Sequence, residues 1–218
     1  MPKVTAPLLS FGAKGQIGNA QVYSSWKGIP YARRYVVPAN PKTAKQTSNR
    51  AVWQMLNAAF LYAPAAVKQA FDAYAIGKPL TGRNKFFQDN MKLLATDPKP
   101  AGIDGLIVSP GNGGGLPPTN LSLTGAANSI VATVDLPEVP DGWTLSGAVA
   151  AAVAQQSPTA EFSSKWFVVT VAADMDEITI PGLTDAQEYV VGYFLKWEKP
   201  DGQIAYSVSL SATGEAGA

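Results

Sequence analysis

The chain has 218 residues, 46% of them hydrophobic and 15% charged, which is enough apolar material for one or two folded domains. It contains no Cys and no His, which excludes disulfides, thiol and imidazole catalysis and the common zinc sites. The net charge of +1 conceals an asymmetry: residues 1–97 carry thirteen Lys/Arg and three Asp (+10), whereas residues 119–218 carry three Lys and twelve Asp/Glu (−9). Opposite charges of this size predict that the two halves face different surroundings, or that copies stack head to tail.

The first segment, residues 8–37, alternates short apolar runs with glycines at positions 12, 15, 18 and 28. This pattern is typical of turns in an antiparallel ribbon, so we predict an irregular Gly-rich β-ribbon here. The glycine spacing also occurs in phosphate-binding loops, but the Gly-Lys-Ser/Thr sequence of such loops is missing. Because isolated two-stranded ribbons are marginally stable in water, this one is expected to pack on its own helices or on another chain.

A dense group of basic residues follows, with no acidic residue among them. Pro38 and Pro41, with Asn40 between them, favour extended backbone and predict a stiff connection into a helix at about Thr43. We name the basic and aromatic residues around this connection the basic hinge: Trp26, Tyr31, Arg33, Arg34, Tyr35, Lys42, Lys45 and Arg50. These eight residues are the predicted partner-binding site, and Pro38, Asn40 and Pro41 are its predicted structural supports.

Three helices are predicted next from apolar side chains at three- and four-residue spacing. The first ends before Pro64, the second starts at Pro64 and closes at Gly77, and the third follows Gly82. Their apolar faces are Val52, Met55, Leu56, Ala59 and Phe60, then Val67, Ala70, Phe71 and Tyr74, then Phe86, Phe87, Met91 and Leu94. We predict a small three-helix unit against the ribbon, with Lys85 and Lys92 exposed.

Residues 96–118 hold five Pro and six Gly, a composition typical of linkers, although the apolar island 103–108 is able to add a strand to a neighbour. The predicted architecture is α+β with two domains. Residues 1–96 form a basic ribbon-and-helix domain, residues 97–118 a linker, and residues 119–218 an acidic all-β domain.

The acidic domain contains seven apolar or alternating segments between turn signals, the strand number of an immunoglobulin-like sandwich. The predicted strands are residues 121–124, 129–136, 144–154, 165–172, 177–180, 188–197 and 205–211. Leu183 and Tyr189, six residues apart after a short strand, resemble the corner of fibronectin type III domains. The resemblance implies that the Tyr189 ring packs in the core while its hydroxyl bonds to the preceding loop. Two features depart from that family: the strand at 144–154 is rich in Ala, and only Trp143 matches its early buried Trp.

A second, more specific pattern lies within residues 10–95: Gly15, Gly18, Trp26, Lys27, Gly28, Arg33, Pro38, Asn40, Pro41, Thr43, Gln46 and Arg50. It resembles a family of small proteins from tailed phages and prophages. The resemblance implies a virion component made in the host cytoplasm, and immunoglobulin-like domains are frequent on phage structural proteins. We therefore expect a non-enzymatic accessory capsid protein, a decoration protein, which binds other virion proteins and copies of itself through its basic half. A neck or tail component is the alternative.

No residues stand out as catalytic, cofactor-binding or metal-binding, so we predict no such site. The one tight acidic cluster, Asp174, Asp176 and Glu177, lies at a predicted turn, where acids more often face solvent than bind calcium. The basic hinge is also able to hold nucleic-acid phosphates, but no known nucleic-acid-binding signature accompanies it, so protein contact is favoured. No apolar run is long enough to span a membrane, and residues 1–15 are too broken by Pro and Gly for a signal sequence.

Overall fold

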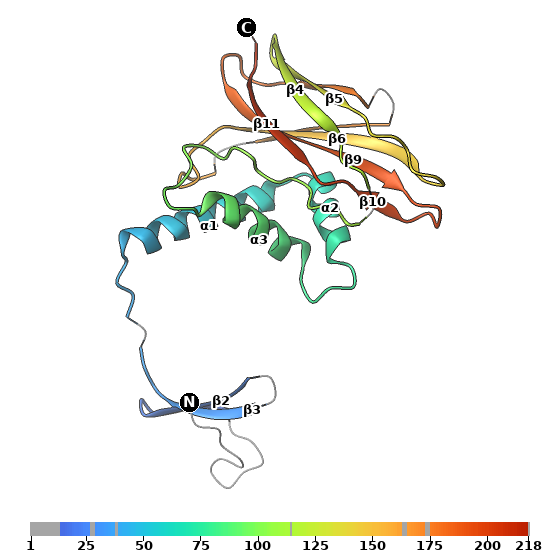
Figure 1. The fold of residues 1–218 in the computed structure, drawn as a ribbon. Helices are drawn as coiled ribbons and strands as arrows, with labels where there is room; N and C mark the ends of the chain where they lie inside the picture. The colour runs from blue at the N-terminus through green and yellow to red at the C-terminus, as the bar shows by residue number, and fades with distance from the viewer. Residues whose placement is uncertain are drawn as a thin grey trace. The chain divides into compact units, whose positions relative to one another are not determined.

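The structure, a computed structural model, describes residues 14–26, 29–37, 39–113, 115–162, 165–172 and 175–217. It divides into two compact units, residues 1–43 and residues 44–218 (Figure 1). This division corrects the predicted boundaries. The three helices, which were expected to share a domain with the ribbon, belong to the same unit as the β domain.

The first unit contains a small antiparallel sheet in the order β1-β2-β3, formed by β1 (Gly15–Ile17), β2 (Gln21–Trp26) and β3 (Ile29–Arg34). Gly18 lies in the turn between β1 and β2 with a φ of +50°, a conformation that glycine adopts at little cost. The predicted ribbon is therefore a three-stranded sheet.

Three helices open the second unit near their predicted bounds: α1 (Ala44–Tyr62), α2 (Ala65–Ala75) and α3 (Gly82–Leu94). Pro64 is the N-cap of α2, and the Thr81 hydroxyl caps α3 by accepting the Asn84 backbone N–H at 3.2 Å. The predicted apolar faces form the helical core, with Phe60, Tyr74 and Met91 only partly buried. The sequence periodicity was therefore sufficient to place these helices.

Lys85 differs from the prediction that it is exposed. Its side chain is 15% exposed, and its Nζ lies 2.8 Å from Asp89 Oδ1, one helical turn away. The same ammonium lies 4.6 Å from the ring centre of Tyr74 on α2, so it also makes a cation–π contact. Lys92 is exposed, as predicted.

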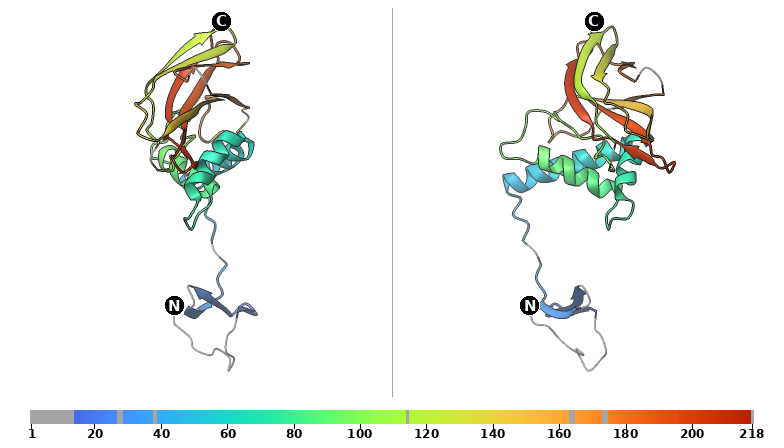
Figure 2. Two further views of the ribbon diagram at one scale, coloured as in Figure 1. Left: turned by 90° about the vertical axis from the view of Figure 1, so that its right-hand side faces the viewer. Right: turned by 45° about the vertical axis from the view of Figure 1, so that its right-hand side comes forward.

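The β domain consists of two packed antiparallel sheets (Figure 2). The smaller has the order β4-β5-β8, from β4 (Thr119–Ala126), β5 (Ser129–Asp135) and β8 (Glu177–Pro181). The larger contains β6 (Thr144–Ala154), β7 (Trp166–Val171) and β9 (Glu188–Glu198), with β10 (Ile204–Tyr206) and β11 (Leu210–Glu215) both paired to β9. This strand order is that of an immunoglobulin-like sandwich. The strand predicted at residues 205–211 is instead two strands, β10 and β11, which are separated by residues 207–209.

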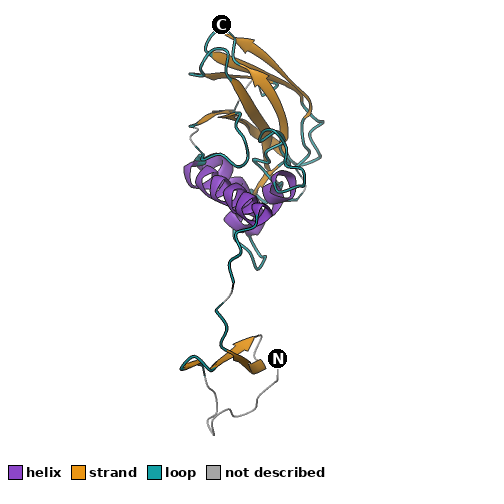
Figure 3. Ribbon diagram, turned by 90° about the vertical axis from the view of Figure 1, so that its left-hand side faces the viewer, coloured by secondary structure: helices purple, strands orange, loops and turns teal. Residues whose placement is uncertain are grey.

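The outer face of the larger sheet is covered by the helices (Figure 3). On β6, Ala148, Ala150 and Ala152 face the interior of the sandwich, whereas Val149, Ala151 and Val153 join the core that contains the helices. A strand that is packed on both faces reads as a continuous apolar run, and small side chains let a second layer approach closely. The Ala-rich segment that departs from the fibronectin type III pattern is thus explained by the helical layer.

The segment predicted as a linker is built into this core. Ile103, Leu106 and Val108 are at most 2% exposed, and all three belong to the core shared by helices and sheet. Val108 packs on Gly192 of β9, where an added Cβ would lie only 2.4 Å from a Val108 methyl carbon. Glycine at position 192 therefore allows the segment to lie directly on the sheet.

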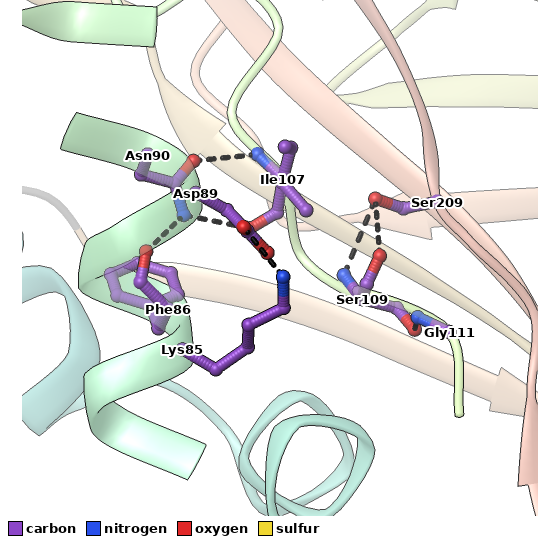
Figure 4. A network of polar contacts seen from close by, with 8 residues as sticks. All are labelled: Lys85, Phe86, Asp89, Asn90, Ile107, Ser109, Gly111 and Ser209. Carbon is purple, nitrogen blue, oxygen red and sulfur yellow. Dashed lines mark hydrogen bonds and ion pairs between the residues drawn. The ribbon is translucent and has the colours of Figure 1, made fainter. Parts of the chain in front are cut away.

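Polar side chains on both sides hold the backbone of this segment in place (Figure 4). The Asn90 amide of α3 accepts the Ile107 N–H at 2.8 Å and donates to the Ile107 carbonyl at 3.1 Å. On the sheet side, the Ser209 hydroxyl accepts the Val108 and Ser109 N–H groups at 3.2 and 3.3 Å. The Ser209 N–H donates to the Ser109 carbonyl at 3.1 Å, and Pro110 forms an isolated bridge with Val208. The apolar island thus leads into a backbone pairing with the break between β10 and β11 of its own chain.

Candidate assembly surface

The N-terminal sheet sorts the side chains of the basic hinge onto two faces. Residues directly opposite each other in an antiparallel pair share a face, and alternate residues along a strand return to it. In the register of β2 and β3, Val22 lies opposite Arg33, Ser24 opposite Tyr31, and Trp26 opposite Ile29. We call the face formed by these six residues the Trp26 face. The other, the Arg34 face, carries Ile17, Gln21, Tyr23, Ser25, Pro30, Ala32 and Arg34.

Arg33 and Arg34 consequently project to opposite sides of the sheet. They are adjacent in sequence and both exposed, but a single flat partner surface can meet only one of them. Arg33 shares its face with Trp26 and Tyr31, as the sequence grouping predicted, and Arg34 does not. The structure thus brings together three of the predicted site residues on one face of the sheet: Trp26, Tyr31 and Arg33.

No described residue of the first unit is buried. Trp26 is 65% exposed, Ile17 48% and Ile29 43%, although each is large and apolar. Within the described residues, β1 and β3 each pair with one strand only, so both present an open edge. A sheet with open edges, exposed apolar faces and no core of its own is suited to contact with another surface.

The connection after β3 is exposed and has no regular secondary structure where it is described. The Tyr35 N–H donates to the Ala20 carbonyl at 2.9 Å, which ties the start of the connection to the turn after β1. Asn40, Pro41 and Lys42 are exposed, and Lys42 has a positive φ of 49°. Pro38 lies outside the described residues. The stiffness of this connection stays a prediction.

Lys45 and Arg50, the last two residues of the basic hinge, lie on α1 and therefore in the second unit. Lys45 Nζ is 3.0 Å from Asp97 Oδ2, with both side chains largely exposed. The hydrogen bond and the charge of Lys45 hold the pKa of Asp97 below its usual value. Lys45 thus has a carboxylate partner in its own unit, and the basic hinge is divided between two units.

Tyr189 occupies the corner position that the sequence resemblance implied. Its side chain is buried, its hydroxyl accepts the Thr184 backbone N–H at 3.0 Å, and Leu183 beside it is 3% exposed. Its ring also meets Phe167 of β7 edge-to-face, with ring centres 5.8 Å apart. Trp143 is only partly buried, and the fully buried Trp of this sandwich is Trp197 on β9.

Replacing Tyr189 by Phe is expected to lower the free energy of unfolding by about 1–3 kcal/mol, because the Thr184 N–H loses its acceptor while the ring remains. Chemical denaturation of the full chain measures this change. Tyr62→Phe is the matched control: that ring is 66% exposed, and its hydroxyl makes no hydrogen bond that the structure shows among the described residues. Equal stability of the Tyr189 variant and the control would show that the corner bond does not contribute.

The predicted acidic cluster shows no arrangement for metal binding in the part of the chain that is described. Asp176 and Glu177 are exposed at the start of β8, Asp174 is outside the described residues, and no group of three or more acidic side chains converges. The nearby Tyr193 hydroxyl donates to the Met175 carbonyl. Burial, and secondarily the charge of Asp176, raises the pKa of Tyr193, so this phenol stays protonated at neutral pH. In the same described part, no helix is long and apolar enough to cross a membrane.

A groove that no sequence pattern indicated lies between α2 and the turn that joins β9 to β10. It has a volume of about 690 Å³. Its lining includes Asp72 and Ala73 of α2, Ile76 at the end of that helix, Lys199 in the turn after β9, and Ile204 and Tyr206 of β10. These residues are more than 120 positions apart, so only the packing of helices on the sheet brings them together. Burial raises the pKa of Tyr206 at this site.

Comparisons with known proteins find no matching family model and no matching curated protein. Among solved structures, the chain is similar to β-sandwich domains that each cover about half of it. A redesigned β-sandwich protein shares 19% identity, with 48% of this chain and 93% of that chain covered and a TM-score of 0.35. The fn3 domain of the human collagen alpha-1(XX) chain shares 22% (48% and 88% covered, TM-score 0.35). The chicken interferon gamma receptor alpha chain shares 19% (47% and 51% covered, TM-score 0.33).

Proposed function

We propose that this protein is a non-enzymatic structural component of a tailed-phage virion, an accessory capsid or decoration protein that docks through its N-terminal sheet. The observation that carries the proposal is that this sheet has exposed apolar side chains and no buried residue, while residues 44–218 form a core of their own. Domains that fold alone bury their apolar faces, so the sheet is suited to stability gained by binding. The phage-family pattern at residues 15–50 supports the virion context.

Two kinds of contact are open to this sheet. The edges of β1 and β3, which are open among the described residues, are able to pair with a strand of another chain, which would extend the sheet by backbone hydrogen bonds. The Trp26 face offers aromatic side chains with Arg33 beside them, a composition typical of protein interfaces. Both kinds of contact favour a protein as the binding partner of the sheet.

A nucleic-acid partner is less well supported. Nonspecific binding to phosphates works best when several cations line one groove or face. Here Arg33 and Arg34 lie on opposite faces, and Lys45 faces Asp97 in the second unit.

A location in the neck or tail of the particle is the alternative to the capsid, since the same sheet would serve assembly there.

Deleting residues 1–30 is expected to abolish incorporation of the protein into phage particles, because β1 and β2 are lost entirely and β3 loses its partner. Quantitative mass spectrometry of purified particles measures the occupancy. The thermal unfolding of the deleted protein is the control, and it should match that of the full chain because the core of residues 44–218 is intact. Wild-type occupancy of the deleted protein would contradict the proposal.

Electron microscopy of particles lacking the protein distinguishes the locations. We expect density to be missing from the outer surface of the capsid. Missing density on the tail, with an unchanged capsid surface, would refute the decoration assignment and support the alternative.

A further inference from the structure

We propose that the N-terminal sheet of one copy docks, through its Trp26 face, into the groove between α2 and the β9–β10 turn of a second copy. This inference rests on the proposed assembly function and names the partner of the same surface. The molecule that fills the groove is thus another copy of this chain, bound head to tail.

The groove has the shape and composition to receive an aromatic side chain. Ile76, at the end of α2, is 80% exposed, and Ile204, on the opposite wall, is 36% exposed. Ala73 and Tyr206 extend the apolar lining, and the groove volume of about 690 Å³ is well above that of one large side chain. Exposed Trp26 and Ile29 on one face of the sheet supply apolar side chains that such a groove would bury.

Carboxylates adjoin the groove. Asp72 lines it, Glu198 lies opposite the lining residue Ile204 at the end of β9, and Asp201 lies in the following turn. Lys199 is the one cation among the described lining residues, and Lys196 lies opposite Tyr206 in the sheet. The loop between β5 and β6, which contains Glu138 and Asp141, approaches this turn, since an added Cβ on Gly142 would lie 3.1 Å from the Pro200 ring. The ion pairs that the structure shows between described residues, Lys45–Asp97 and Lys85–Asp89, involve none of these carboxylates.

The sheet carries the opposite charge. Residues 1–43 contain six Lys/Arg and no Asp or Glu, and Arg33 lies on the same face as Trp26. An aromatic anchor beside an arginine therefore meets an apolar groove beside carboxylates, a match in both polarity and charge. Because the two surfaces are different parts of the chain, one such contact leaves a sheet and a groove unfilled. Further copies then extend it to a ring or an open filament, whereas a reciprocal exchange between two copies closes a dimer.

Sedimentation velocity of the full-length protein over a range of concentrations tests this contact. We expect self-association at low salt that weakens at high salt, because exposed charges contribute to it. Trp26→Ala is expected to weaken the association about tenfold or more through loss of the anchor. Arg33→Glu is expected to weaken it as well, whereas the matched control Arg34→Glu, the same change on the opposite face, is expected to leave it near wild type.

On the groove side, Glu198→Lys is expected to weaken association, and Glu215→Lys is its matched control. Both residues are exposed near strand ends of the same sheet, but Glu215 pairs with Glu188 at the end of β9 remote from Glu198. An equimolar mixture of the Arg33→Glu and Glu198→Lys proteins is expected to associate more strongly than either alone, since the two reversed charges complement each other.

The inference is overturned if the wild-type protein is monomeric at all concentrations, or if the control variants weaken association as much as the test variants. Its failure is distinguishable from that of the proposed function. A monomeric protein that still enters particles, and loses incorporation on deletion of residues 1–30, refutes the copy-to-copy contact and leaves the virion role standing.

Discussion

A fragment of residues 119–218 is expected to aggregate or to unfold at a much lower temperature, whereas residues 44–218 are expected to fold as a soluble unit. The separate fragment would expose Val149, Val153 and Phe194, which are at most 2% exposed beneath the helices and the 103–108 segment. Contiguous apolar patches of this kind are rare on monomeric proteins and promote association. Size-exclusion chromatography and thermal denaturation of both fragments measure the effect.

A surface-repaired fragment provides the control. Replacing Val149 and Val153 by Thr and Phe194 by Ser within residues 119–218 is expected to restore solubility, because the exposed face becomes polar. The same three changes in residues 44–218 are expected to be strongly destabilising, since buried methyl groups and a buried ring are lost there. If the unmodified 119–218 fragment is monomeric and melts at the temperature of residues 44–218, the helical layer contributes no stability to the sandwich.

Asn90→Ala is expected to lower the free energy of unfolding by about 2–5 kcal/mol, because it leaves two backbone groups of Ile107 without partners. Asn90 is completely buried, and its side chain accepts the Ile107 N–H and donates to the Ile107 and Phe86 carbonyls (Figure 4). For a chain of this size the loss corresponds to a melting temperature roughly 5–15 °C lower.

Asn84→Ala on the same helix is the matched control, since Asn84 is exposed. Its effect on stability is expected to lie within about 0.5 kcal/mol of zero. Differential scanning calorimetry of residues 44–218 carrying either change makes the comparison. A neutral Asn90→Ala would show that the 103–111 segment is held by its apolar contacts alone.

The sequence by itself determined most of the local structure. Helical spacing and the positions of Pro64, Gly77 and Gly82 placed the three helices, because these signals act within a few residues. Alternation and turn residues located the strands of the sandwich, and one short motif placed Tyr189 at its corner. Each of these features depends on interactions between residues that are close in the chain.

Only the tertiary structure decided how these elements combine. Proline and glycine predicted a linker at residues 97–118, yet apolar residues within it bind the helices to the sheet. That outcome depends on Gly192 and Asn90, which meet the segment from distant parts of the chain. Likewise, adjacent Arg33 and Arg34 read as one basic patch until the strand register placed them on opposite faces. Burial and register are set by long-range packing, and a one-residue difference in register reverses the face of every side chain.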